Sequence, residues 1–327
     1  MITFFSTVPG ALILLVLGFI FLIKGADFFV EGASAVAKKL HVPALVIGMT
    51  IVAMGTSLPE LSVSVTASLA GSNQLAIGNV VGSNIFNLMV VLGSCALFSV
   101  LEVSVDTIKK DFPFSVICAV GLMIMGIIGS EVGHIDGVIL LVAFIFFLGS
   151  MLKAAKKSRK DAALAENEEN EIVDIPVWLC VVYIIGGAVA IKFGGDWVVG
   201  ACTTLALKFG MSETLVGLTI VALGTSLPEL VTSIVAARKN ELDMAIGNVV
   251  GSNVFNILLI LGTAGAISPM TYLTVNAIDT LILVGFSVIV WIMCFKKKSL
   301  GRLNGIIMLL LYVAYLAYII IRDGGVA

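Results

Sequence analysis

The sequence is poor in charge, in histidine and in cysteine motifs. Only 12% of its 327 residues are Asp, Glu, Lys or Arg, well below the roughly 25% that is usual for a soluble domain. A net charge of −2 provides no field for a nucleic acid, so no nucleic-acid partner is expected. Two histidines and five cysteines without a CxxC motif favour neither a zinc site nor a disulfide framework. No cofactor is therefore expected.

Hydrophobic residues make up 59% of the chain instead. A helix needs roughly 20 apolar residues to cross the hydrocarbon core of a bilayer, and the sequence contains ten such runs. The expected spans are 9–30, 43–70, 74–99, 112–130, 135–153, 176–200, 212–237, 242–268, 276–295 and 303–321. The sequence thus predicts an all-α membrane protein with ten transmembrane helices, embedded in a lipid bilayer.

The distribution of lysine and arginine predicts the orientation, because these residues stay on the cytoplasmic side of short loops. With the N-terminus outside, fifteen of the nineteen basic residues fall in cytoplasmic loops and only Lys208 and Arg322 fall outside. Both termini are therefore expected outside. The polar segment 154–174 is expected to be a solvated cytoplasmic loop. A calcium sensor is an alternative there, although the segment has no EF-hand spacing.

The chain contains an internal repeat. A shift of 169 residues aligns 46–93 with 215–262 without a gap, and 27 of the 48 positions are identical. Five expected spans separate equivalent helices, and because five is odd the second copy crosses the bilayer in the opposite direction. The sequence therefore predicts two inverted five-helix repeats, 1–153 and 175–327. Secondary transporters are typically built in this way, with the binding site near the midplane where the repeats meet.

Each repeat places one glutamate deep inside a span, Glu60 in the second and Glu229 in the seventh. An ionisable group at that depth costs at least about 2.5 kcal/mol and marks an ion pathway by default. The alternative is a buried salt bridge, for which only Lys24 and Lys192 lie inside spans. Each lysine has a closer carboxylate at helical spacing, in Asp27 and Asp196. The glutamates are therefore interpreted as uncompensated carboxylates that attract cations.

A proline directly precedes each glutamate, at positions 59 and 228. Proline lacks an amide hydrogen and clashes with the carbonyl four residues back, so it kinks the helix and frees carbonyl oxygens. Ser57 and Ser226 lie three residues before the glutamates, and Ser64 and Ser233 four after them, on the same helical face. A kinked packing helix is the alternative interpretation. Its inverted duplication favours an oxygen-lined ion site.

The helix after each glutamate carries amide and hydroxyl side chains at a spacing of four, Asn79, Ser83 and Asn87 in one copy and Asn248, Ser252 and Asn256 in the other. Carboxylate, hydroxyl, amide and carbonyl oxygens without nitrogen or sulfur ligands select Ca²⁺, Na⁺ or Mg²⁺. Mg²⁺ gives up its water reluctantly, which favours Ca²⁺. Two carboxylates are balanced by one Ca²⁺ and could also be occupied by two or three Na⁺, and competition for one site predicts antiport.

The motif GTSLPE at 55–60 and 224–229, followed by GNVVGSN at 78–84 and 247–253, resembles the alpha repeats of the cation/Ca²⁺ exchanger superfamily. The resemblance is greatest to the prokaryotic Na⁺/Ca²⁺ exchanger branch and covers the whole chain. It implies an antiporter in the plasma membrane of a prokaryote that takes Ca²⁺ and Na⁺ as substrates, with spans 9–30 and 176–200 as a sliding gate.

The resemblance also implies a set of cation ligands. These are the Glu60 and Glu229 carboxylates, the main-chain carbonyls of Thr56, Thr225, Ala53 and Ala222, and side-chain oxygens of Ser57, Ser226, Ser83, Ser252, Asn87 and Asn256. Several relatives carry Asp where this chain has Asn256, and in them that carboxylate is linked to K⁺ dependence or to the charge of the middle site. Its absence here weakens the case for K⁺ co-transport.

Three alternatives to Na⁺/Ca²⁺ exchange remain open at this point. H⁺/Ca²⁺ exchangers of the same superfamily use similar glutamates as proton carriers, and a K⁺-linked exchanger would have the same fold. A cation channel is more distant, because channels gather their carboxylates around an axis normal to the membrane. An enzyme is not expected, since no GxSxG or HExxH motif is present and the sequence offers no catalytic dyad. The sequence names no protein partner.

Overall fold

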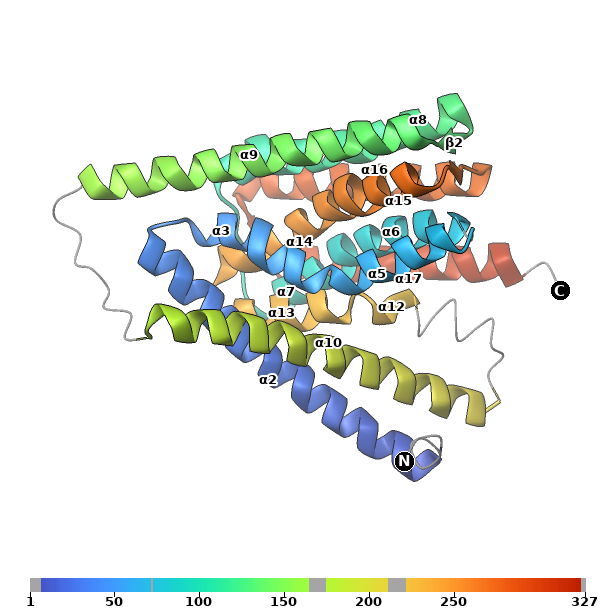
Figure 1. Ribbon diagram of the computed structural model, residues 1–327, viewed down its shortest axis with the longest axis horizontal. Coiled ribbons are helices and arrows are strands. Elements are labelled where there is room, and N and C mark those ends of the chain that lie inside the picture. The colour runs from blue at the N-terminus through green and yellow to red at the C-terminus, as the bar shows by residue number, and fades with distance from the viewer. Residues whose placement is uncertain (1–6, 72, 165–174, 211–221, 325–327) are drawn as a thin grey trace.

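The computed structural model describes residues 7–71, 73–164, 175–210 and 222–324, which are almost entirely helical (Figure 1). Up to residue 164 the elements are α2 (Val8–Leu40), α3 (Ala44–Ile47), η1 (Gly48–Val52), α4 (Ala53–Thr56), α5 (Leu58–Leu69), α6 (Asn73–Phe86), η2 (Asn87–Val91), α7 (Leu92–Phe98), β1 (Leu101–Glu102), η3 (Thr107–Asp111), α8 (Phe112–Gly129), β2 (Glu131–Val132) and α9 (His134–Leu164). The later elements are α10 (Val177–Lys208), α12 (Ala222–Gly224), α13 (Leu227–Arg238), α14 (Leu242–Phe255), η5 (Asn256–Leu261), α15 (Gly262–Ile267), β3 (Met270–Thr271), α16 (Thr274–Lys297), β4 (Ser299–Leu300) and α17 (Arg302–Gly324). Elements marked η are single π-helical turns.

The prediction of an all-helical, multi-pass membrane protein is confirmed. Eight helical stretches of the described chain are long and apolar enough to cross a membrane. A ninth candidate is the stretch Ala44–Thr56 together with Leu58–Leu69, two segments that meet at an angle of 50°. The expected span 212–237 begins among residues outside the described ranges, so the count of ten spans stays a prediction.

Three helices extend well beyond their expected spans. Helix α2 ends at Leu40 instead of 30 and α10 at Lys208 instead of 200, and the third is α9. Helix α9 continues to Leu164, through the first half of the segment 154–174 that was expected to be a polar loop. The residues from 154 to 164 read AAKKSRKDAAL and contain neither glycine nor proline. Alanine, lysine, arginine and leucine all have high helix propensity, so the helix extends beyond its apolar part. Residues 165–174 lie outside the described ranges.

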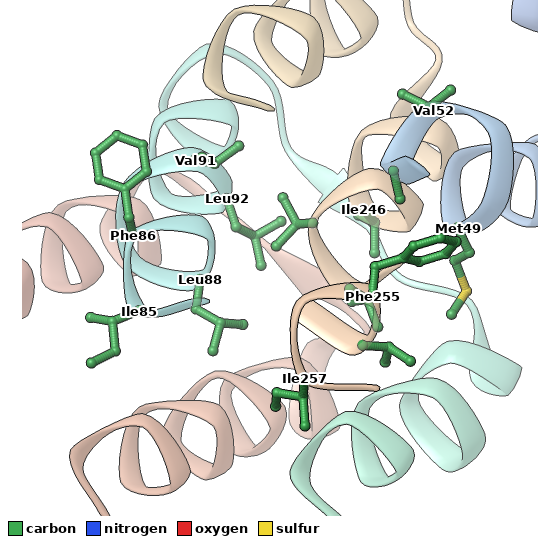
Figure 2. Close-up of a cluster of buried hydrophobic side chains, with 14 of the residues drawn as sticks. Met49, Val52, Ile85, Phe86, Leu88, Val91, Leu92, Ile246, Phe255 and Ile257 are labelled. Atoms are coloured by element: carbon green, nitrogen blue, oxygen red, sulfur yellow. The ribbon is translucent and has the colours of Figure 1, made fainter. Parts of the chain in front are cut away.

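Two helical stretches form the centre of the molecule. In the most apolar part of Leu242–Ile267, 94% of the residues are buried, and in that of Leu75–Phe98 78% are buried. In the other long stretches the buried share is at most 33%. Apolar side chains from η1, α6, η2, α14 and η5 meet there, among them Met49, Leu88 and Phe255 (Figure 2). The two stretches that carry the repeated asparagine motif are therefore the ones shielded from lipid.

Two short strand pairs join the halves of the sequence. Strand β1 pairs with β4 and β2 pairs with β3, both antiparallel. Leu101 lies opposite Leu300, and Glu131 lies opposite Thr271. Because 101 and 270, like 131 and 300, differ by the repeat shift of 169, each pair joins a strand of one copy to the non-equivalent strand of the other.

Helices α2 and α10 lie side by side and form a pair at one side of the helical body (Figure 1). Glycines hold their backbones together: a Cβ at Gly187 would lie 2.7 Å from the carbonyl oxygen of Gly25, and one at Gly194 would lie 2.6 Å from the amide nitrogen of Leu22. Such a contact between small residues is the usual device for close helix packing in membranes. The backbones of α2 and α10 are therefore tightly packed against each other.

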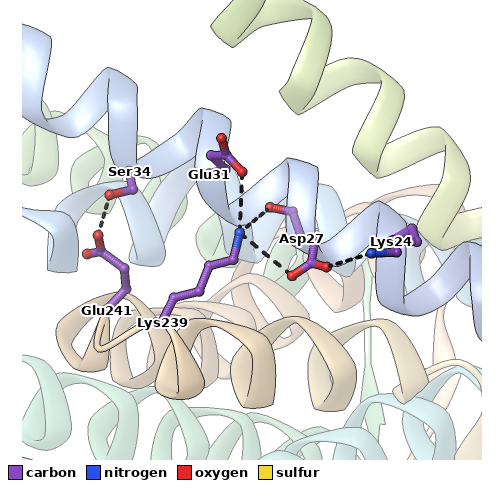
Figure 3. A network of polar contacts seen from close by, with 6 residues as sticks. All are labelled: Lys24, Asp27, Glu31, Ser34, Lys239 and Glu241. Carbon is purple, nitrogen blue, oxygen red and sulfur yellow. Dashed lines mark hydrogen bonds and ion pairs between the residues drawn. The ribbon is translucent and has the colours of Figure 1, made fainter. Parts of the chain in front are cut away.

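A polar network connects α2 to the end of α13 (Figure 3). The Lys239 ammonium donates to the main-chain oxygen of Asp27 at 3.0 Å and lies 3.4 Å from Glu31 Oε2, and Ser34 donates to Glu241. The expected local pairs are also confirmed, with Lys24 Nζ 3.8 Å from Asp27 Oδ2 and Lys192 Nζ 2.6 Å from Asp196 Oδ2. Neither span lysine is therefore a partner for the buried glutamates.

The packing of α2 on α10 predicts opposite effects for two adjacent glycines. Gly187→Ala places a methyl group against the backbone of α2 and is expected to destabilise the protein by about 1–3 kcal/mol, the usual cost of overpacking. Gly186→Ala is the matched control, because a Cβ there meets no described atom within 4 Å and alanine has the higher helix propensity. Thermal unfolding in detergent, followed by intrinsic fluorescence, measures both. Equal unfolding temperatures would contradict the close backbone contact.

Candidate functional site

Glu60 and Glu229 each lie in the first turn of a helix that starts where the preceding helix is interrupted. Helix α4 ends at Thr56 and α5 starts at Leu58, while α12 and α13 are separated by Thr225 and Ser226. Both glutamates are 0% exposed. The unpaired amides at a helix N-terminus favour a negative charge. The proline-induced break thus places each carboxylate where main-chain dipoles stabilise it.

Hydrogen bonds from the serines of each repeat to the glutamate of the other bring the two glutamates into one site. Ser57 Oγ donates to Glu229 Oε1 at 2.8 Å, and the equivalent Ser226 Oγ donates to Glu60 Oε1 at 3.0 Å. Ser83 Oγ lies 3.0 Å from Ser226 Oγ and 3.5 Å from Glu60 Oε1. Each glutamate is therefore bound by the serine that precedes the other glutamate.

Several buried oxygen atoms in the same region have no hydrogen-bond partner among the described residues. They are Glu60 Oε2, Glu229 Oε2, Ser252 Oγ, Asn87 Oδ1 and Asn256 Oδ1, all on residues expected from the sequence. Thr232 Oγ1 and Asn253 Oδ1 also lack a partner, but these two residues are not in the ligand set expected from the sequence. Buried polar atoms are almost always hydrogen-bonded, so the unpartnered oxygens of the five expected residues are available to a ligand.

Among the described residues, no ion pair joins a basic side chain to either carboxylate. The ion pairs of Lys24, Lys110, Lys192, Lys239 and Arg322 in the described chain all involve other acidic residues. No cluster of three His, Cys, Asp or Glu residues is found in the same ranges either. Burying an ionised carboxylate without a counter-charge is costly. The site therefore offers two charges and neutral oxygen ligands, as a hard cation requires.

Asparagines on α6 and α14 hold the broken helices in place. Asn79 Nδ2 donates to Ser64 Oγ at 3.0 Å, and its equivalent Asn248 Nδ2 donates to Ser233 Oγ at 2.9 Å. The oxygen of Asn248 accepts from Thr56 Oγ1 at 3.2 Å. The structure thus assigns these asparagines to fixing the glutamate-bearing helices, and the remaining polar atoms are left for a ligand.

The main-chain ligands stay a prediction. The carbonyl of Ala53 accepts the amide of Ser57 at 3.0 Å and lies 3.3 Å from Thr56 Oγ1, while Thr225 Oγ1 lies 3.5 Å from Asn79 Oδ1. Ala222 is the first residue of α12, and its side chain is outside the described set. These residues lie at the two helix breaks, beside the serine and glutamate pairs.

Two features of the site were not predicted from the sequence. Asn84 and Asn253 are buried between α6 and α14, although they are identical in both copies of GNVVGSN. The π-helical turns η2 and η5 begin at Asn87 and Asn256, and such turns occur frequently at functional sites. The exact repetition was the available signal for the asparagines. No residue pattern indicated the π-helical turns.

Comparison with known proteins identifies similar chains along almost the whole length. The family model described as sodium/calcium exchanger protein matches residues 10–153 and 179–321. The chain is 36% identical over 310 residues to the putative antiporter CaxA of Alkalimonas amylolytica, covering 94% of this chain and 97% of the relative. It is 32% identical over 338 residues to the sodium/calcium exchanger MaX1 of Methanosarcina acetivorans, covering 93% and 97%.

A solved structure has a similar fold. The sodium-calcium exchanger NCX_Mj, soaked with Na⁺ and Sr²⁺, superposes with a TM-score of 0.83 at 33% identity, covering 95% of this chain and 99% of that chain. The same exchanger soaked with Na⁺ and Ca²⁺ gives a TM-score of 0.81 at 31% identity, covering 94% and 97%. The likeness therefore extends over both halves of the chain.

The unpartnered oxygens predict that Ca²⁺ stabilises the folded protein. A ligand at a hundred times its dissociation constant adds about 2.7 kcal/mol, so millimolar Ca²⁺ is expected to raise the unfolding temperature in detergent. Glu229→Gln is expected to remove this shift, because the neutral amide halves the charge of the site. Glu131→Gln, at an exposed position in β2, is the control that keeps the shift. A full Ca²⁺ shift in Glu229→Gln would exclude the site.

Proposed function

Because the chain belongs to the sodium/calcium exchanger family, we propose that it exchanges Ca²⁺ for Na⁺ across the plasma membrane of a prokaryotic cell. The family consists of ion transporters, not enzymes, and its members use no cofactor. The observation that carries the proposal is the reciprocal pair of serine–glutamate hydrogen bonds. It joins two buried, uncompensated carboxylates into one cation site built from both repeats.

Charge balance gives the mechanism of exchange. Two carboxylates are neutralised by one Ca²⁺, and Na⁺ ions that use the same oxygens neutralise them equally well. A site that holds neither ion leaves two charges buried without a partner, which is unfavourable in a low-dielectric interior. One ion therefore leaves as the other enters, and the empty protein does not change its access from one side to the other.

The ligand set follows the arrangement of the site. Glu60 and Glu229 supply the charges, and the Ser57, Ser226, Ser83 and Ser252 hydroxyls, the Asn87 and Asn256 amides and the Thr56, Thr225, Ala53 and Ala222 carbonyls supply neutral oxygens. The unpartnered oxygens of Ser252, Asn87 and Asn256 support their inclusion. Residue 256 is a neutral asparagine, so the site charge stays at two. The carboxylate that several relatives carry at this position is absent, which weakens the case for K⁺ co-transport.

Two inverted repeats, 1–153 and 175–327, joined by the cytoplasmic segment 154–174, provide the two halves of the site. Figure 1 supports this arrangement, since α2 begins and α17 ends at one end of the molecule while α9 ends and α10 begins at the other. Together with the bias of the basic residues, this supports an orientation with both termini outside. Helix α10 contacts α4 and α13, and α2 contacts α13, a position beside the site from which the pair can gate it.

Transport in proteoliposomes tests the exchange. Uptake of radioactive Ca²⁺ is expected to require Na⁺ inside the vesicle, with the membrane potential clamped. Glu60→Gln and Glu229→Gln are each expected to lower the initial rate at least about hundredfold, which corresponds to about 2.7 kcal/mol. Glu131→Gln is expected to transport at the wild-type rate.

Two outcomes would contradict Na⁺/Ca²⁺ exchange. Uptake driven by an outward H⁺ gradient without Na⁺ would make the glutamates proton carriers and the protein an H⁺/Ca²⁺ exchanger of the same fold. Uptake that requires neither counter-ion would indicate a channel. Wild-type rates in Glu60→Gln or Glu229→Gln would exclude the shared site itself.

Cysteine labelling tests the orientation. In a variant without the five native cysteines, Ser158→Cys is expected to react with a membrane-impermeant maleimide only after the cells are opened. Ala327→Cys is expected to react in intact spheroplasts, because the C-terminus is placed outside. The reverse pattern would invert the topology and leave the repeat in place.

A further inference from the structure

Asn84 and Asn253 form a reciprocal bridge between α6 and α14. Asn84 Nδ2 donates to the main-chain oxygen of Asn253 at 3.1 Å, and Asn253 Nδ2 donates to the main-chain oxygen of Asn84 at 3.2 Å. Both side chains are at most 1% exposed. The two residues are equivalent in the repeat, and the amide nitrogen of each makes one hydrogen bond to the backbone of the other central helix.

Beyond this bridge the two repeats differ. Asn84 Oδ1 accepts a hydrogen bond from Asn256 Nδ2 at 2.9 Å. The equivalent contact would join Asn253 Oδ1 to Asn87 Nδ2, and both of these atoms are without a partner among the described residues. The asymmetry therefore lies in the contact between the bridge and the amide that faces the site.

The hydrogen bond fixes which end of the Asn256 amide is available to a cation. A carboxamide has one acceptor end and one donor end. The nitrogen of Asn84 is committed to a carbonyl, so its oxygen accepts, and the Asn256 nitrogen is committed in turn. The atom that remains is Asn256 Oδ1, which is buried and unpartnered. Only the oxygen end of an amide coordinates a hard cation.

We propose that Asn84 is a positioning residue that turns the Asn256 carboxamide so that its oxygen faces the transported cation. The second repeat thereby presents a preorganised ligand, whereas Asn87 in the first repeat presents an amide that no described residue holds. This inference rests on the proposed function, in which Asn256 binds a transported ion. Residues that orient a metal ligand typically change metal affinity by about 10–100-fold when they are replaced.

Equilibrium binding to the full chain in detergent tests the proposal, with Ca²⁺ alone and Na⁺ alone as probes. The readout is the dissociation constant of the ion that Asn256→Ala binds more weakly than the wild-type protein does. Asn84→Ala is expected to weaken the binding of that ion by about 10–100-fold. Asn253→Ala is the matched control, because it removes the same bridge donor without touching Asn256, and it is expected to change the affinity less than about threefold, below the range for an orienting residue.

A double-mutant cycle separates positioning from a purely structural role. If Asn84 acts through Asn256, the variant Asn84→Ala/Asn256→Ala binds as tightly as Asn256→Ala alone. Further weakening in the double variant, or equal weakening in Asn253→Ala, would overturn the proposal. Unfolding temperatures are compared in parallel, and those of Asn84→Ala and Asn253→Ala are expected to fall by similar amounts.

The failures of the two proposals are distinguishable. Normal binding by Asn84→Ala together with weak binding by Asn256→Ala would overturn the positioning role and keep Asn256 as a ligand. Normal binding of both ions by Asn256→Ala would remove Asn256 from the ligand set and overturn the positioning role as well. If Asn84→Ala does not fold, Asn84→Ser replaces it, because its hydroxyl is one bond too short to hold Asn256.

Discussion

Two carboxylates are buried in the middle of a membrane protein, and no ion pair among the described residues joins them to a basic side chain. They are the constraint on which the rest of the structure depends. Glu60 and Glu229 are both 0% exposed. Their charge is tolerable only where helix N-termini, hydroxyl donors and a bound cation replace the water that they have lost. The proline breaks supply the helix termini and the serines supply the donors. The remaining buried oxygens have no partner among the described residues.

The duplication of the sequence makes this site a shared property of the two halves. Ser57 binds Glu229 and Ser226 binds Glu60, so neither repeat satisfies its own glutamate through these serines. The bridge between α6 and α14 follows the same rule, with each asparagine bound to the backbone of the other copy. Reciprocal contacts of this kind follow when equivalent segments meet around a pseudo-two-fold axis.

Departures from this symmetry are as informative as the symmetry itself. Lys239 reaches across to α2, whereas the residue 169 positions earlier is Ala70 and has no side chain for such a contact. Asn256 is held by Asn84, while Asn87 has no partner among the described residues. Two halves with identical motifs therefore differ in the hydrogen bonding of Asn87 and Asn256 and in their polar contacts to α2 and α10.

The sequence by itself determined the membrane class, the internal repeat and the chemistry of the site, because long apolar runs, a fixed shift of 169 and the LPE motif are local or repetitive patterns. Helical spacing also placed Ser57, Glu60 and Ser64 on one face, and all three are buried. Only the tertiary structure decided that each serine binds the opposite glutamate, that Asn84 holds Asn256, and that π-helical turns begin at Asn87 and Asn256. These features depend on where helices distant in sequence cross, which no spacing within one helix specifies.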